Sequence, residues 1–231
     1  MGALFEEIDY RETPLGAISL RRRRVLALDL DVYEVILGDE HLMSSLFTAG
    51  EIALAQLGLA ATDAPVLDVI VGGLGLGYTA RAALDDPRVR SLEVIDAMQA
   101  VIGWHRRGLV PLGGELAGDP RGSLVHGDFF AAMREPGPKV QAILLDIDHS
   151  PRALLNTGNG PFYTAKGLAG AAARLVAGGV FALWSDEAPD PDFEAVMAEV
   201  FEACKATVVG FDNPLTGGRS SNTVYVGRAR A

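Results

Sequence analysis

The sequence predicts an α/β protein built on a doubly wound, mostly parallel sheet. Three observations support this class. Apolar strand-like runs alternate with helical patterns from Pro65 to Lys205. The run Val140–Leu145 is apolar except for Gln141, as expected of a parallel strand covered on both faces. As the third observation, the run Val66–Val71 leads into a glycine-rich turn followed by a helix. We therefore expect ligands to bind outside the carboxyl ends of these strands.

The first part of the chain has a β-rich pattern. Strands are expected at Ala17–Leu20, Val25–Leu30 and Val32–Leu37, with a hairpin turn at Gly38–Asp39. We assign residues 1–47 to a small N-terminal β-strand region with a hairpin, and residues 48–231 to a doubly wound nucleoside-binding domain. The arginines Arg21–Arg24 fit a solvated strand edge better than a binding surface.

The rest of the chain is expected to alternate between helices and strands. Helices are predicted at Leu46–Leu59, Gly77–Leu84, Ala97–Arg107, Thr164–Val176 and Asp192–Lys205. Strands are predicted at Val66–Val71, Ser91–Ile95, Ser123–His126, Val140–Leu145, Gly179–Trp184, Ala206–Phe211 and Thr223–Gly227. The last two strands have no helix between them, which predicts an antiparallel C-terminal strand. Thr48 and Glu51 have the spacing of a capping box at the start of the first helix.

Composition argues against several classes of function. The net charge of −10 disfavours a nucleic-acid partner, whose binding surface needs basic residues. The single cysteine, Cys204, cannot form an intrachain disulfide and fits a reducing compartment. The N-terminus lacks the features of a signal peptide, and no apolar run approaches the ~18 residues of a membrane span. We expect a soluble cytoplasmic protein with no membrane partner.

Gly73, Gly75 and Gly77 form the glycine-rich turn after the strand Val66–Val71. Glycine lets the backbone approach a ligand, and the following helix offers free N–H groups at the positive end of its dipole. The GxGxG spacing is not that of a P-loop or a strict GxGxxG, and is more typical of nucleoside binders such as S-adenosylmethionine (SAM) enzymes. Tyr78 follows the loop, where it either lines a substrate pocket or packs its helix.

Acidic residues follow the next two predicted strands. Asp96 lies about 20 residues after the glycine loop, where an acid commonly accepts hydrogen bonds from ribose hydroxyls. Asp128 is placed to bind the amino group of an adenine, with Phe129 supporting the ring by stacking. For Asp128 a helix N-cap is the alternative. Because such acids recur at consecutive strand ends, we favour a nucleoside site.

Further acids follow the later strands. Asp146 and Asp148 precede His149, and Asp186 and Glu187 follow the strand Gly179–Trp184. The acids together concentrate negative charge that would attract a cationic substrate, and we take His149, Asp186 and Glu187 as candidate substrate-binding residues. One carboxylate, with Asp146 or Asp148 as the candidates, can accept a proton from an attacking amine. The four histidines show no metal-binding spacing, so we predict no metal.

With these residues assembled, the chain resembles the spermidine synthase (polyamine aminopropyltransferase) family from about Leu15 to Gly227. The segments that carry the resemblance are VYEVILGDEHLMSS, VIVGGLGLGYTARAAL, HGDFF, AILLDIDHSP and FYTAKGLAGAAARLVAGGVFALWSDE. The resemblance implies a small N-terminal β-domain followed by a Rossmann-like domain of the class I SAM-methyltransferase type. It also implies a role in polyamine biosynthesis and a homo-oligomer, usually a dimer.

Carried over by position, Asp96 would hold the ribose, Asp128 the adenine amino group, and Asp146 would accept the proton of the amine. SAM or decarboxylated SAM is the implied co-substrate, and a small cationic amine the acceptor. The family's loop GGGDGG has an aspartate at a position that we read as Leu76 here, and Asp148 stands one position early in the catalytic loop. A SAM-dependent small-molecule methyltransferase is therefore the first alternative. A non-catalytic nucleoside-binding protein is the second.

Overall fold

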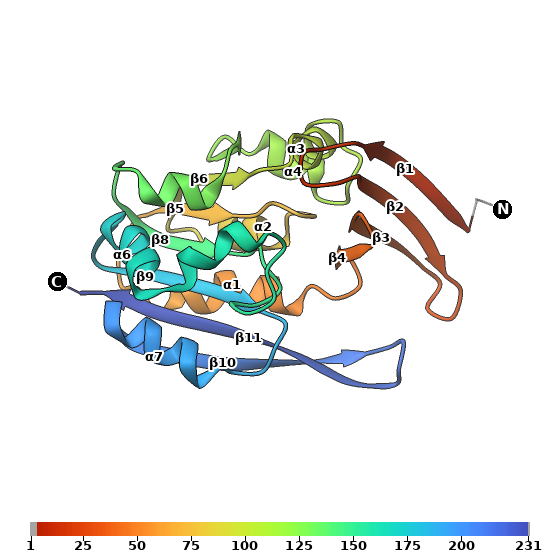
Figure 1. Cartoon of the computed structure of the whole chain (residues 1–231). Coiled ribbons are helices and arrows are strands. Elements are labelled where there is room, and N and C mark those ends of the chain that lie inside the picture. The colour runs from red at the N-terminus through yellow and green to blue at the C-terminus, as the bar shows by residue number, and fades with distance from the viewer. Residues whose placement is uncertain (1–3, 231) are drawn as a thin grey trace.

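The computed structural model describes residues 4–230 and contains two β-sheets (Figure 1). The smaller sheet has the strands β1 (Phe5–Arg11), β2 (Ile18–Val25), β3 (Leu30–Leu37) and β4 (Glu40–Ser44). The larger has β5 (Leu67–Gly72), β6 (Val89–Asp96), β7 (Gly122–His126), β8 (Val140–Leu145), β9 (Leu175–Ser185), β10 (Phe201–Asn213) and β11 (Gly218–Ala229). The smaller sheet is antiparallel, in the order β1-β2-β3-β4. We call it the N-terminal sheet.

The larger sheet has the order β10-β11-β9-β8-β5-β6-β7. Strand β11 is antiparallel to both of its neighbours, whereas the pairs β5–β6, β5–β8, β6–β7 and β8–β9 are parallel. The predicted fold class, including the antiparallel C-terminal strand, is therefore confirmed. After β5, the chain adds β6 and β7 on one side and then returns to place β8 on the other. Such a reversal of strand order is where open α/β sheets bind ligands.

Helices cover both faces of the larger sheet. They are α1 (Ala49–Ala60), α2 (Tyr78–Leu84), α3 (Gln99–Arg106), α4 (Gly113–Gly118), α5 (Phe129–Arg134), α6 (Ala165–Ala173) and α7 (Pro191–Val200), with a 3₁₀ helix, η1, at Thr157–Tyr163. Successive strand residues point to opposite faces, so Val69 and Val71 join the core under α1 to α3, while Ile70 joins the core under α5 to α7. No helix in residues 4–230 is long and apolar enough to cross a membrane.

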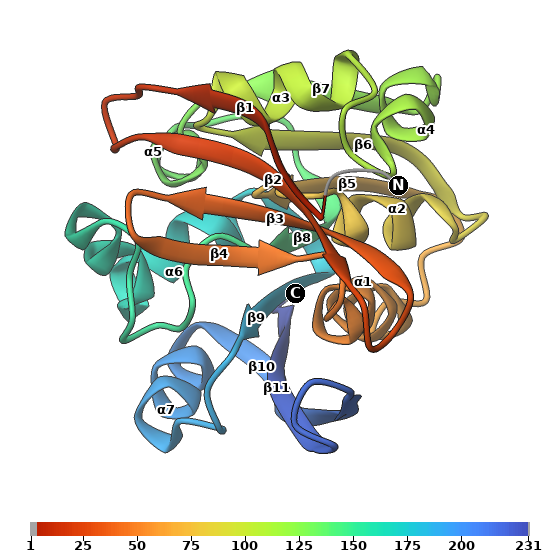
Figure 2. The ribbon, with the colours of Figure 1, turned by 90° about the vertical axis from the view of Figure 1, so that its right-hand side faces the viewer.

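The N-terminal sheet lies across the carboxyl edge of the larger sheet, with β4 nearest α1 and β1 nearest α3 (Figure 2). Its buried residues Ile18, Leu20, Val35 and Leu37 belong to the same core as the helices α1 to α3. Where β1 meets α3, the indole Nε1 of the fully buried Trp104 donates to Asp9 Oδ2 at 2.7 Å. Because the sheet is both packed and hydrogen-bonded, it forms a fixed cover over that edge.

Several predicted elements of the first 60 residues differ in the structure. Strand β1 was missed, and the predicted strand Val25–Leu30 is wrong, because residues 26–29 form the turn between β2 and β3. Arg21–Arg24 do not lie at an edge: β2 is an inner strand, and its arginines pair with acids that include Glu6 and Glu34. Thr48 is the N-cap residue of α1, but its side chain makes no cap hydrogen bond. The capping-box role of Glu51 is therefore wrong.

At the C-terminal end, the predicted helix Asp192–Lys205 is too long. Helix α7 stops at Val200, and β10 begins at Phe201, so Cys204 lies in a strand. The pairing of β10 with β11 is irregular between Glu202 and Lys205, where Ala203 has a φ of 52°. This bulge breaks the alternation of side chains that would have identified a strand in the sequence.

Removing the Asp9 carboxylate is expected to destabilise the protein by about 2 kcal/mol, since Asp9→Ala leaves the buried indole N–H of Trp104 without a partner. Urea denaturation measures the change. Asp212→Ala is the matched control, because the Asp212–Arg219 pair is exposed on both sides and spans 3.6 Å. We expect the control to change stability by less than about 0.5 kcal/mol. Equal losses in both variants would contradict an anchoring role for Asp9.

Candidate active site

A cavity of about 360 Å³ lies between the N-terminal sheet and the carboxyl ends of the parallel strands. Its volume is in the range of small-molecule sites. The N-terminal sheet, with the turn between β1 and β2, contributes an apolar cover of six residues, Leu15, Ile18, Val35, Leu37, Leu42 and Met43. The opposite wall carries four carboxylates, those of Glu51, Asp96, Asp128 and Asp146, together with His149. The cavity therefore combines an apolar cover with an acidic wall.

The glycine loop forms part of this wall through Gly73 and Gly75. Gly73, Gly75 and Gly77 have φ values of 93°, 48° and 93°, a left-handed region that favours glycine. A Cβ on Gly73 would lie 1.9 Å from the carbonyl oxygen of Asp146, so only glycine allows the loop and the end of β8 to approach this closely. Leu76 is fully buried in the core and its backbone N–H points to Met43 Sδ at 3.0 Å. The Leu76 side chain consequently does not line the cavity.

Asp96 lies at the end of β6 and is 9% exposed. Its carboxylate accepts hydrogen bonds from the N–H groups of Leu74 at 2.8 Å and Met98 at 2.7 Å. Burial raises the pKa of this carboxyl, and the backbone N–H bonds oppose the rise. Asp96 thus holds the glycine loop against the start of α3, and its remaining lone pairs can accept bonds from a ligand.

Asp128 and Phe129 lie at the same end of the cavity. Asp128 is the N-cap of α5 and accepts a hydrogen bond from the N–H of Ala131 at 3.1 Å, so the N-cap alternative is confirmed. The residue is exposed and also lines the cavity. Phe129 is only 2% exposed and packs against Gly72 and Phe162. Little of its ring is therefore available for the predicted stacking on an adenine.

Asp146 lies directly after β8, opposite the glycine loop. Its backbone N–H donates to the carbonyl of Gly72 at 2.8 Å, and its Oδ2 accepts from the Thr79 hydroxyl at 2.6 Å. Burial raises the pKa of Asp146 to about 6. On the neighbouring α1, burial and the charge of Asp146 raise the pKa of Glu51 to about 8. The centre of the cavity is thus a pair of acids that cannot both ionise easily.

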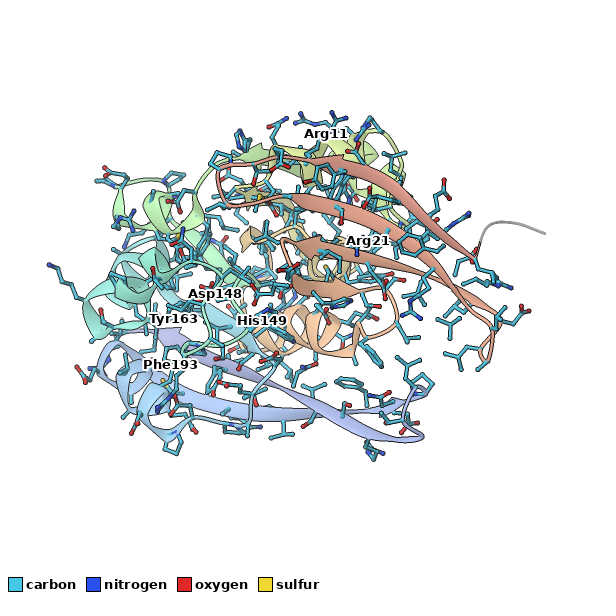
Figure 3. All side chains as sticks on the ribbon, turned by 45° about the vertical axis from the view of Figure 1, so that its right-hand side comes forward. Arg11, Arg21, Asp148, His149, Tyr163 and Phe193 are labelled. Atoms are coloured by element: carbon cyan, nitrogen blue, oxygen red, sulfur yellow. The ribbon has the colours of Figure 1, made fainter. Side chains whose placement is uncertain are left out.

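Asp148 is in a different environment, and it is not among the residues that line the cavity. It is 3% exposed, and it accepts hydrogen bonds from the N–H of Leu155 at 2.7 Å, the amide of Asn159 at 2.9 and 3.0 Å, and the hydroxyl of Tyr163 at 2.7 Å. Figure 3 shows Asp148 and Tyr163 together, with His149 toward the N-terminal sheet. These bonds fix the segment 150–163, which gives Asp148 a structural role; its catalytic role stays a prediction.

The four predicted substrate-binding residues are divided between the cavity and its surroundings. His149 lines the cavity, and its Nε2 contacts Glu40 Oε1 of β4 at 3.0 Å, joining the loop after β8 to the N-terminal sheet. Asp186 and Glu187 are exposed beyond β9 and are not lining residues, although Asp186 lies 3.7 Å from His149 Nδ1. Tyr78 is half-buried and is not a lining residue either; burial and the charge of Glu51 raise its pKa.

Three solved structures share this architecture. A spermidine synthase from Thermotoga maritima matches 96% of this chain and 72% of its own, with a TM-score of 0.75 and 16% identity. A spermidine synthase in complex with the transition-state analogue AdoDATO matches the same shares, with a TM-score of 0.74 and 16% identity. A probable spermidine synthase from Corynebacterium glutamicum matches 95% of this chain and 79% of its own, with a TM-score of 0.67 and 20% identity. The chain has a spermidine synthase-like fold.

These comparisons confirm the resemblance at the level of the spermidine synthase fold. No family model and no curated protein sequence matches the chain. Within residues 4–230, no group of three or more His, Cys, Asp and Glu side chains is arranged to hold a metal ion. The activity must therefore be argued from the cavity itself.

Sequence reasoning missed several residues that line the cavity, among them Glu51, Met43, Asn156, Asn159 and Trp184. It also missed Thr79, which does not line the cavity but donates a hydrogen bond to Asp146. One signal could have found Glu51, because it is the only charged residue in the segment AGEIALAQLGLA. A lone acid on an otherwise apolar buried helix is costly unless it has a partner or a function. Met43 and Thr79 have no comparable signal, since ordinary packing explains either residue type.

Replacing Asp148 by asparagine is expected to lower stability by about 2 kcal/mol, because one amide oxygen cannot accept the bonds that two carboxylate oxygens accept. Tyr163→Phe removes one of the same bonds and serves as the comparison, with an expected loss of about 1 kcal/mol. Thermal denaturation measures both. A change in the pH–rate profile of Asp148→Asn without loss of stability would support a catalytic role for this residue.

Proposed function

We propose that this protein is a transferase that moves an aminopropyl group from decarboxylated SAM to a small amine. The observation that carries the proposal is the position of Asp146. Its half-buried carboxylate lies at the reversal of strand order, opposite the glycine loop, in a cavity lined by four acids. The spermidine synthase-like fold supports a transferase of this class.

The residues of the cavity fit a cationic nucleoside. Asp96 and Asp128 lie at the end where the glycine loop meets α3, and their carboxylates suit ribose hydroxyls and an adenine amino group. No lysine or arginine lines the cavity within residues 4–230. A carboxylate-bearing ligand such as SAM would meet four acids and no cationic partner there, whereas decarboxylated SAM brings only positive charge. The charge of the cavity therefore favours the decarboxylated form.

Decarboxylated SAM supplies an aminopropyl carbon on a positive sulfur; the amine nitrogen bonds to that carbon, and methylthioadenosine leaves with the electrons of the broken carbon–sulfur bond. The amine must lose a proton so that its nitrogen lone pair is free. Asp146, with a pKa of about 6, is ionised at neutral pH and can accept that proton. The Thr79 hydroxyl holds the other side of the carboxylate through Oδ2. The protein supplies position, charge and a proton acceptor.

Calorimetry with decarboxylated SAM, SAM and methylthioadenosine tests the co-substrate. We expect decarboxylated SAM to bind more tightly than SAM, and we expect methylthioadenosine to bind. Mass spectrometry should then detect methylthioadenosine when decarboxylated SAM is incubated with primary amines such as n-butylamine and 1,4-diaminobutane. Tighter binding of SAM, with methyl transfer, would replace the proposal by the methyltransferase alternative. Nucleoside binding without turnover of any amine would support the non-catalytic alternative.

A further inference from the structure

Glu51 is a buried acid that the proposed reaction does not yet use. It lies in the first turn of α1, is 7% exposed, and lines the cavity. Its carboxylate accepts a hydrogen bond from its own backbone N–H, and none from any other residue in the part of the chain that the structure describes. Asp96 and Asp148, which are buried to a similar extent, accept two or more such bonds each. A buried acid with no partner on another residue points to a ligand group that completes its hydrogen bonds.

The surroundings of Glu51 specify the charge of that group. Asp146 lies close enough for its charge to act on Glu51, and the Thr79 hydroxyl connects the two residues through Asp146 Oδ2 at 2.6 Å and the Glu51 carbonyl oxygen at 3.3 Å. No lysine or arginine within residues 4–230 lines the cavity to balance the two acids. The titratable groups that face Glu51 are Asp146 after β8 and Tyr78 on α2. A bound cation would therefore relieve a repulsion that the protein leaves uncompensated.

We propose that Glu51 and Asp146 together form a subsite for a primary ammonium group. An ammonium has three N–H donors, enough for both carboxylates, and no acceptor that would clash with them. The subsite rests on the proposed function, which supplies two sources of this chemistry. One is the amine acceptor, and the other is the aminopropyl end of decarboxylated SAM. Leu42 and Met43 of β4 supply apolar side chains to the cover of the same cavity, where they can pack on the carbon chain of either ligand.

Titration calorimetry at pH 7.5, in two buffers that differ in ionisation enthalpy, tests the subsite. One arm titrates 1,4-diaminobutane into protein saturated with methylthioadenosine, and the other titrates decarboxylated SAM into free protein. In the wild type, we expect the ligand whose ammonium group occupies the subsite to release up to one proton from Glu51 and Asp146 when it binds. In Glu51→Gln we expect that proton release to disappear and the affinity in that arm to fall by about tenfold.

Glu93→Gln is the matched control, because Glu93 is exposed on β6 and the substitution makes the same change of charge. Methylthioadenosine should bind equally to all three proteins, which shows that the variants are folded. Unchanged affinity and proton release in both arms of Glu51→Gln would overturn the subsite and leave the proposed function in place. If wild-type protein binds neither nucleoside, both the subsite and the proposed function are wrong.

Discussion

Replacing Asp146 by asparagine is expected to lower kcat by about 10²–10⁴-fold with little change in the affinity for methylthioadenosine. Asparagine has nearly the shape of aspartate, and its amide oxygen can still accept a hydrogen bond from the Thr79 hydroxyl in place of Oδ2. It cannot take a proton from the amine. Asp146 is half-buried, and its carboxylate is held in place by the Thr79 hydroxyl. Steady-state kinetics with decarboxylated SAM and an amine that gives turnover measures the change.

The control for this experiment is Thr79→Val, which removes the hydroxyl but leaves the Asp146 carboxylate able to ionise. We expect its effect on kcat to be about tenfold at most, with the acid limb of the pH–rate profile moved to higher pH, because the lost bond had stabilised the carboxylate. If Asp146→Asn turns over at the wild-type rate, the proton acceptor is another group and the mechanism is wrong.

The second large effect is expected in the pH dependence of stability. Burial and the charge of Asp146 raise the pKa of Glu51 from 4.5 to about 8 in the folded protein. When the pKa of a carboxyl is higher in the folded than in the unfolded protein, its contribution to stability is complete at pH values below the unfolded pKa. That contribution is lost as the pH rises through the folded pKa. Asp146, raised to about 6, acts in the same direction. The free energy of unfolding should therefore fall between about pH 4.5 and pH 8.

In Glu51→Gln most of this fall should disappear, since glutamine fills the same space without a charge. We expect the variant to be more stable than the wild type above pH 8 by on the order of 2–4 kcal/mol. Urea denaturation at pH 5, 7 and 9 measures both proteins. Carboxyls held by arginines, such as Asp119 with a pKa of about 2, titrate below this range and do not obscure it. A wild-type profile that is flat from pH 5 to pH 9 would contradict the buried acid pair.

The sheet could be predicted from the sequence because its signals are local. The runs Val66–Val71 and Val140–Leu145 are apolar except for Asp68 and Gln141, and both form strands of the parallel sheet. The glycines of the loop needed no tertiary information, since their alternation already implied unusual backbone angles. Strand β1 gave no such signal, because Phe5 and Tyr10 are exposed and only Ile8 among its apolar residues packs against the core. It forms by pairing with β2, a contact that no local pattern encodes.

The site was harder to predict than the sheet, because the same residue type serves different purposes there. Asp146 and Asp148 are two residues apart in the sequence, yet one lines the cavity and the other is enclosed by Asn159, Tyr163 and Leu155. Which acid is free depends on how the segment 150–163 folds back, and spacing does not determine that. Glu51 was misread for a similar reason, since its spacing from Thr48 suits a cap whose hydrogen bond does not form.

The apolar cover of the cavity and its acidic wall come from different parts of the chain, and this separation affects how the sequence can evolve. The cover contributes Leu15, Ile18, Val35, Leu37, Leu42 and Met43, and none of these side chains can exchange a proton. The acids and the histidine that line the cavity all come from residues after position 48. Substitutions in β2, β3 and β4 can therefore alter the shape offered to a ligand while the acids stay in place. Acceptor preference can diverge in this way among descendants that keep one chemistry.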